Sequence, residues 1–200
     1  INAIFTPPGG DQMWNLNNLQ VESSQNIVFH PPSDGMAAAS APGAELVTFG
    51  APHPEEYFNV TPSVMETMGY FDKNMGFWGG SELAANNFFN YTPPLAERHA
   101  PLNFFDIYQS TCNSLEAFAP SDLDPSFGSI IQFLVPTADS IRFRETHQRL
   151  DVVDAWGSMT IPEGTYDVLR VKRTEYRSRA IDVKVSPLGW IDISTIGGQQ

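Results

Sequence analysis

Acidic side chains are the most numerous candidates for chemistry in this sequence, and two pairs lie close together along the chain. Glu55 and Glu56 are adjacent, and Asp122 and Asp124 are two residues apart between two prolines. A glycoside hydrolase needs two carboxyl groups at a defined separation, and carboxylate oxygens also suit Ca²⁺. The second pair lacks the glycine and distal glutamate of a helix-loop-helix calcium loop, so an Asx turn explains it equally well. We therefore treat Asp122 and Asp124 both as a candidate Ca²⁺ site and as the one carboxylate pair that a hydrolase could use.

The other reactive side chains form no catalytic or metal-binding pattern. The four histidines are widely spaced and lack a ligand motif, and His147 is expected at the surface of a strand. Cys112 is the single cysteine, which excludes an internal disulfide framework, and its neighbourhood holds too few bases to activate a thiol. No Gly-x-Ser-x-Gly elbow or phosphate-binding glycine loop is present. These features predict a protein that is not an enzyme and needs no cofactor.

Aromatic rings and asparagines are concentrated between residues 70 and 108. Rings supply rigid apolar area and amides supply adaptable hydrogen bonds, which is the chemistry of surfaces that bind sugars or proteins. The candidate binding residues are Tyr70, Trp78, Asn87 and Tyr91. The alternative is that these rings belong to the core. Both interpretations stay open, although neighbours such as Phe88 and Phe89 cannot both point inward from one strand.

The elements that must position these side chains are strands. From residue 141 onward, apolar and polar residues alternate with the period of two that is typical of a sheet with one buried face. Ile161-Pro162-Glu163-Gly164-Thr165 separates two such runs and predicts a hairpin turn. Residues 141–200 therefore indicate a regular β-meander.

Residues 1–140 read as short strands joined by long loops. They hold 15 acidic and 2 basic residues, whereas residues 141–200 hold 8 acidic and 9 basic residues. They also contain most of the prolines. Proline cannot donate a hydrogen bond to a sheet, so regular pairing must be interrupted often. The small, alanine-rich segment 31–43 predicts an exposed loop, with disorder as the alternative. Together the patterns predict one domain over residues 1–200, an all-β antiparallel sandwich of jelly-roll type with long Pro/Asn-rich loops and little helix.

The net charge of −12 excludes several classes of partner. An acidic surface repels phosphate backbones, so we expect no binding to nucleic acid. No apolar run is long enough to span a bilayer, so membrane insertion is not expected. The chain begins at Ile1 without a signal-peptide pattern, and we expect a mature, processed form.

Three stretches resemble the domain that precedes the carboxy-terminal sorting domain in cargo proteins of the type IX secretion system. The first is Pro8 to Leu19, with its Pro-Gly and Trp-Asn-Leu groups. The second runs from Tyr91 to Leu95 and from Pro101 to Asp106. The third and most specific is Asp154 to Lys172, which is similar to a hairpin with the pattern Gly-Thr-Leu-x-x-Pro-x-Gly-x-Tyr-x-x-Leu-Arg.

The resemblance implies a place outside the cell or on its outer surface, because the shared motifs are structural and carry no catalytic residues. It also implies that Arg170, at the end of the third motif, pairs across strands. Asp139-Ser140-Ile141 looks like the Asp-Ser/Thr-aliphatic acceptor for O-glycosylation in such bacteria. Ser140 is therefore a candidate glycan site.

Three functions remain open from the sequence. The first is a non-catalytic structural or adhesive protein that works through protein–protein contacts, with other subunits, cell-surface components or further copies of itself as partners. The second is a carbohydrate-binding domain with a polysaccharide as its ligand. The third is a glycan hydrolase that uses loop carboxylates.

Overall fold

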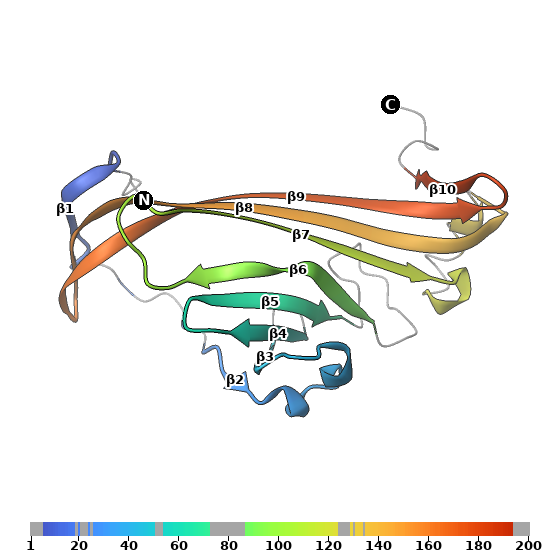
Figure 1. Ribbon diagram of the computed structural model, residues 1–200, viewed down its shortest axis with the longest axis horizontal. Coiled ribbons are helices and arrows are strands. Elements are labelled where there is room, and N and C mark those ends of the chain that lie inside the picture. The colour runs from blue at the N-terminus through green and yellow to red at the C-terminus, as the bar shows by residue number, and fades with distance from the viewer. Residues whose placement is uncertain are drawn as a thin grey trace.

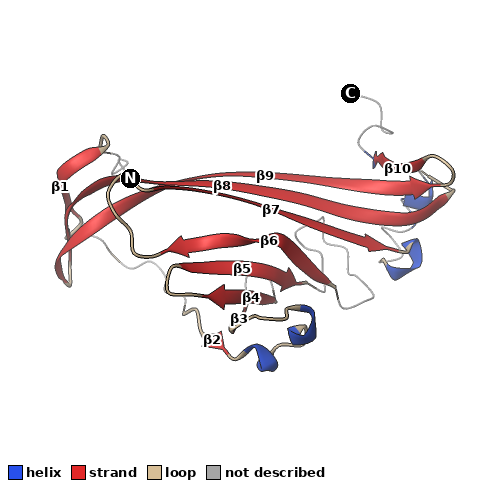
Figure 2. Ribbon diagram, viewed as in Figure 1, coloured by secondary structure: helices blue, strands red, loops and turns tan. Residues whose placement is uncertain are grey.

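The structure is a computed structural model that describes residues 6–18, 20, 24, 26–50, 54–72, 87–123, 129, 131–133 and 135–193. Strands dominate these residues, and the few helical segments are single short turns (Figure 2). The prediction of a mostly antiparallel, all-β fold is confirmed. The strands are β1 (Gly9–Asn15), β2 (Phe29–His30), β3 (Leu46–Phe49), β4 (Glu55–Val60), β5 (Val64–Phe71), β6 (Phe88–His99), β7 (Ile107–Phe118), β8 (Ala138–Ile161), β9 (Gly164–Val185) and β10 (Gly189–Asp192).

The strands of the described residues form one open sheet in the order β10-β9-β8-β7-β6-β5-β4-β3-β2, and β1 pairs with β8. Each strand in this path follows its chain neighbour, so the connections are those of a meander and differ from the crossed connections of the jelly roll that we anticipated. Strands β6 and β7 share only the Thr92–Asn113 pair. The sheet bends there into two layers: β7, β8 and β9 form a long band above β2 to β6 (Figure 1).

A core of buried side chains joins the two layers. Tyr70 and Leu95 of the lower layer pack with Phe143 and Val183 of the upper layer in one cluster. This cluster takes residues from both the acidic, loop-rich part of the chain and the regular part after residue 140. The sandwich-like arrangement follows, since each layer buries one face against the other.

The β8–β9 hairpin is the longest element of the molecule, with strands of 24 and 22 residues. The predicted turn lies between them: Ile161 pairs with Gly164, which takes a φ of +151°, a conformation open to glycine. At residue 154 the strand β8 carries one extra residue, because Val153 pairs with Val171 but Ala155 pairs with Arg170. This bulge fixes the register of every pair that precedes it on β8.

The prediction of an exposed loop over residues 31–43 is wrong in part. Two short 3-10 turns, η1 (Pro32–Asp34) and η2 (Ala38–Ser40), fold over the outer face of β3 and β4. Ala37 and Ala41 are buried there against Tyr57. The backbone N–H of Ala37 donates to Oε2 of Glu55 at 3.2 Å, and the Tyr57 hydroxyl donates to the same oxygen at 2.6 Å. Small residues occur in this segment because the backbone must approach the sheet closely.

The amino-terminal strand β1 runs parallel to the end of β8 and brings two of the sequence motifs together. Gln12 pairs with Gly157 and Trp14 pairs with Met159. A Cβ atom on Gly157 would lie 2.0 Å from the Gln12 carbonyl oxygen, so only glycine permits this approach. Arg170, which we expected to pair across strands, donates from Nε to Oδ1 of Asp154 at 2.7 Å. It also donates to the carbonyl of Thr6 at 2.9 Å.

Replacing Gly157 with alanine is expected to detach β1 from β8 and to lower the free energy of unfolding by about 1 to 3 kcal/mol. The physical reason is the overlap of the new methyl group with the Gln12 backbone. Hydrogen exchange of the β1 amides, together with urea unfolding, measures both effects. Ser158→Ala, one residue along, is the control and should leave β1 protected. Unchanged protection of β1 in the Gly157→Ala variant would contradict the prediction.

Candidate functional site

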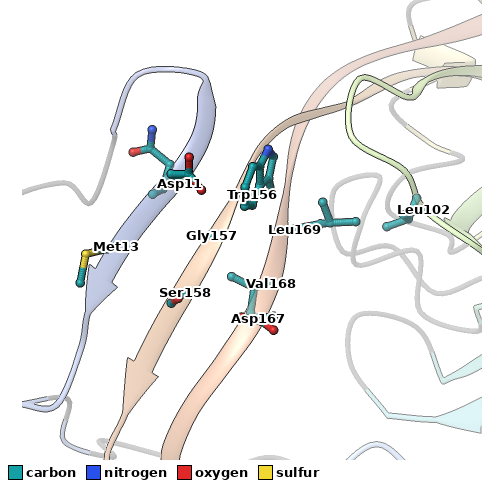
Figure 3. A pocket seen from close by; sticks show the side chains of 10 residues that line it. Asp11, Met13, Leu102, Trp156, Gly157, Ser158, Asp167, Val168 and Leu169 are labelled. Carbon is teal, nitrogen blue, oxygen red and sulfur yellow. The ribbon is translucent and has the colours of Figure 1, made fainter.

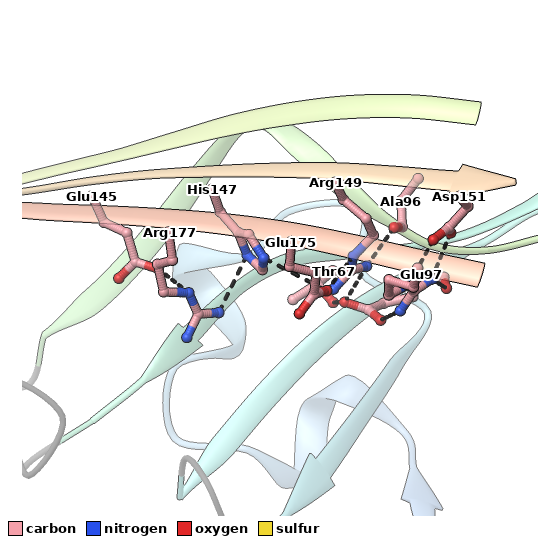
Figure 4. Close-up of polar contacts among 10 residues, drawn as sticks. Thr67, Ala96, Glu97, Glu145, His147, Arg149, Asp151, Glu175 and Arg177 are labelled. Atoms are coloured by element: carbon pink, nitrogen blue, oxygen red, sulfur yellow. Dashed lines mark hydrogen bonds and ion pairs between the residues drawn. The ribbon is translucent and has the colours of Figure 1, made fainter. Parts of the chain in front are cut away.

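The inner face of the long hairpin carries ionisable side chains where a sandwich usually places apolar ones. Along β8 the residues Glu145, His147, Arg149 and Asp151 all point toward the lower layer, and each is at most 6% exposed. Their cross-strand partners on β9 are, in the same order, Arg179, Arg177, Glu175 and Arg173. We call these eight residues the ion-pair ladder, and Figure 4 labels its members Glu145, His147, Arg149, Asp151, Glu175 and Arg177.

Three of the four pairs of the ladder join opposite charges, and the fourth joins Arg177 to the neutral His147. Nε and Nη2 of Arg173 each lie 2.8 Å from a carboxylate oxygen of Asp151. Nε of Arg149 donates to Oε1 of Glu175 at 2.6 Å. Nε of Arg177 lies 3.0 Å from Oε1 of Glu145. The buried charges of β8 are therefore neutralised by partners on β9 that stay partly exposed.

The ladder also ties the upper layer to β5 and β6. Arg149 donates to the Ala96 carbonyl at 2.6 Å and lies 3.0 Å from Oε1 of Glu97. The Thr67 hydroxyl donates to the same Glu97 oxygen at 3.2 Å, and Arg173 donates to the Glu97 carbonyl at 2.6 Å. These contacts place a polar region between the two layers, beside the apolar cluster that holds Phe143 and Val183.

Burial sets the protonation of the groups in and beside the ladder. The pKa of His147 is lowered, first by burial and then by the charge of Arg177. An Arg177 N–H faces Nδ1 of His147 at 3.2 Å, so this nitrogen accepts and the neutral ring carries its proton on Nε2. Burial raises the pKa of Glu145 and raises that of the Cys112 thiol to about 11. Cys112 is buried and its inertness stays a prediction, whereas the expected surface placement of His147 is wrong.

Glu56 of β4 lies at the edge of this polar layer. Its pKa is raised from 4.5 to about 7, mainly because of burial and next because of the charge of Glu97, while Arg177 and Arg149 oppose the shift. The group therefore changes charge near neutral pH. The charges that act on it are those of Glu97, Arg177 and Arg149, and Glu97 itself lies 3.0 Å from Arg149.

The outer face of the same strands is uncharged over three consecutive rows. Its nine side chains are Gln109, Thr111 and Asn113 of β7, Thr146, Gln148 and Leu150 of β8, and Thr174, Tyr176 and Ser178 of β9. We call this surface the neutral face. Tyr176 is 68% exposed and Leu150 is 39% exposed, and the Thr146 hydroxyl donates to the Asn113 side chain at 2.8 Å.

Over these rows, in the middle of the long sheet, the two faces depart from the usual arrangement. In a sheet with one wet face, charged residues point to water and apolar residues point to the core. Here the four charged rows face inward and the three neighbouring outward rows hold no charge, in a chain with a net charge of −12. A surface that lacks charge in so acidic a chain is a candidate for contact with another molecule.

A second candidate lies at the turn end of the hairpin. A hollow of about 970 Å³ is lined by Asp11 and Met13 from β1, Trp156 from β8, and Asp167 and Leu169 from β9 (Figure 3). Trp156 is 40% exposed, and a Cβ on Gly10 would lie 2.5 Å from its indole nitrogen. Glycine at position 10 therefore keeps β1 close to the ring, which borders the hollow.

Comparison of the chain with family models, with curated proteins and with solved structures finds no match in any of the three. The resemblance to type IX cargo domains and the extracellular location stay predictions. Among the described residues, no helix is long and apolar enough to cross a membrane.

The structure corrects two of the four aromatic and amide positions predicted for binding. Tyr70 is 1% and Tyr91 is 5% exposed, because both rings pack in the core between the layers. Tyr70 stacks on Phe89 with ring centroids 4.9 Å apart, so no sugar ring can occupy that face. Asn87 precedes β6, and its carbonyl accepts from the Asp72 N–H at 3.3 Å. Trp78 lies outside the described residues.

The predicted Ca²⁺ and hydrolase pair cannot be assembled from the described part of the chain. Asp122 ends the 3-10 turn η4 (Pro120–Asp122), where its Oδ2 accepts from the Ala119 N–H at 3.2 Å. Asp124 lies outside the described residues. No group of three or more metal-ligating side chains occurs among the residues that are described.

Ser140 is half-buried at the start of β8. Its hydroxyl donates to the Phe118 carbonyl at 2.9 Å, which links β8 to the end of β7. Glycosylation of Ser140 stays a prediction, and this bond would have to be given up for the glycan to form.

Proposed function

We propose that this chain is a non-catalytic structural or adhesive protein, working outside the cell, and that the neutral face is its contact surface. The single observation that supports the proposal is the absence of charge from the three outward rows of the neutral face, which lie opposite the charged rows of the ladder. Charged groups cost free energy when they lose water at an interface without a partner, whereas amides, hydroxyls and rings cost less. An outward face that has no charged groups and many amides and hydroxyls therefore suits association.

The ion-pair ladder supports the non-catalytic part of this proposal. Its carboxylates and guanidinium groups neutralise one another in fixed pairs, and the His147 Nδ1 is occupied by Arg177. General acid–base catalysis needs a group within reach of a substrate proton. The ladder residues on β8 are at most 6% exposed, which leaves them in a structural role.

Placing charge on the neutral face tests the proposal. In the variant Gln109→Glu/Gln148→Glu, each substitution keeps the size of the side chain and adds one negative charge. We expect binding of the labelled, purified protein to cells of the producing species to fall about tenfold, because each carboxylate would lose water without gaining a partner. Flow cytometry measures the binding.

The matched control is Gln132→Glu, an exposed glutamine outside the neutral face. It adds one negative charge, against two in the double variant, and should leave cell binding unchanged. Equal binding by the wild-type protein and the double variant, with both folded, would contradict the neutral face as the contact surface.

A further inference from the structure

We propose that the neutral face binds an uncharged polysaccharide, an inference that rests on the proposed function and names the partner of that same surface. The side chains carry the argument. Besides Leu150 and Tyr176, the face consists of amides and hydroxyls, which both donate and accept hydrogen bonds. A chain of neutral sugars presents hydroxyl groups of the same two-way character.

Tyr176 supplies the apolar contact that such a ligand needs. Its ring is 68% exposed and lies in the central row beside Gln148, with Leu150 in the next row. An aromatic ring offers a flat apolar face with a polar hydroxyl at its edge. A sugar ring can therefore stack on Tyr176 while Gln148 and Thr111 bond its hydroxyls.

The shape of the surface favours a polymer over a single sugar. Side chains on one face of a strand lie about 7 Å apart and strands about 5 Å apart, so the three rows cover about 14 by 10 Å. At one edge Gln109 and Thr111 border a hollow shared with Pro93 and Pro94, and beyond it the face is the open side of a sheet, whereas a small molecule is usually enclosed by its pocket. A flat surface open at both ends gathers enough contacts only from a ligand that extends across it.

The composition of the neutral face argues against a protein or a polyanion as its partner. The centre of a protein interface is enriched in aromatic residues, methionine and arginine, and serine and threonine contribute little to its hot spots. Four of the nine side chains here are Thr or Ser, at positions 111, 146, 174 and 178. A polyanion is disfavoured by the net charge of −12.

Affinity electrophoresis in native gels tests the inference. The wild-type protein, Tyr176→Ala and the control Tyr166→Ala are run through gels that contain hydroxyethylcellulose, xyloglucan or laminarin, with alginate as the polyanion. Tyr166 is 50% exposed near the hairpin turn, outside the neutral face. We expect at least one neutral polymer to retard the wild-type protein and Tyr166→Ala, and the affinity of Tyr176→Ala to be about fivefold lower.

Several outcomes would overturn the inference. These are no retardation by any neutral polymer, retardation by alginate alone, and equal retardation of Tyr176→Ala and the wild-type protein.

Light scattering separates failure of the polysaccharide inference from failure of the proposed function. A dimer that Gln109→Glu/Gln148→Glu dissociates would make a second copy the occupant of the neutral face, and would leave the proposed function standing. If those two charges changed neither cell binding nor association, both proposals would fail.

Discussion

Replacing Arg149 with methionine is expected to lower the free energy of unfolding by about 2 to 4 kcal/mol, because the change leaves the buried Ala96 carbonyl without its donor and removes the ion pairs to Glu97 and Glu175. Arg149 donates to Glu175 at 2.6 Å, lies 3.0 Å from Glu97 and donates to the Ala96 carbonyl at 2.6 Å. Methionine fills much of the same volume, so the loss reports the unpaired polar groups and not a cavity. Urea unfolding followed by circular dichroism measures it.

Arg98→Met is the matched control. Arg98 is exposed on β6, next to Glu97 in the chain, and surface substitutions of this kind usually change stability by no more than about 0.5 kcal/mol. A similar small loss for Arg149→Met would show that the ladder is not a structural tie between the layers. The structural role that we assign to these charges would then be wrong.

Replacing Glu56 with glutamine is expected to stabilise the protein strongly at pH 8 and hardly at all at pH 4. The pKa of Glu56 is about 7 in the folded chain, against its ordinary value of 4.5. Between these values the folded state binds a proton that the unfolded state has released, so the contribution of Glu56 to stability falls as the pH rises from 4.5 to 7. The full loss is about 3 kcal/mol, and glutamine avoids it because it stays uncharged.

The measurement is the difference in unfolding free energy between Glu56→Gln and the wild-type protein, taken from urea unfolding at pH 4, 6 and 8. Taking the difference removes the contribution of the other titrating groups, which both proteins share. The difference should grow with pH and level off above pH 7. Parallel pH profiles for the two proteins would contradict the burial of this carboxyl group beside Glu97.

The hairpin shows what local sequence could predict. Alternation of apolar and polar residues from residue 141 onward indicated strands, because each strand must bury one face. Proline and glycine in Ile161 to Thr165 located the turn, because their backbone preferences act within a few residues. These properties depend on neighbours along the chain.

The ion-pair ladder could not be predicted in the same way, although its residues are visible in the sequence. Between residues 142 and 151, charged or polar side chains occupy both faces of the strand, so alternation does not say which face is inside. The extra residue at position 154 then shifts the register by one. Without this bulge, counting back from the turn would pair Asp151 with Thr174 instead of Arg173, and would place the opposite face of β9 beside it.

The binding role predicted for Tyr70 and Tyr91 was wrong for a related reason. Exposure of Tyr70 and Tyr91 depends on whether another layer covers them, and the bend between β6 and β7 places the long hairpin over both rings.

The sequence by itself determined the strands, the hairpin turn and the acidic balance, since these follow from backbone preferences and composition. Only the tertiary structure decided which charges were buried and which face stayed neutral. Those outcomes depend on register and on the packing of layers that lie far apart along the chain.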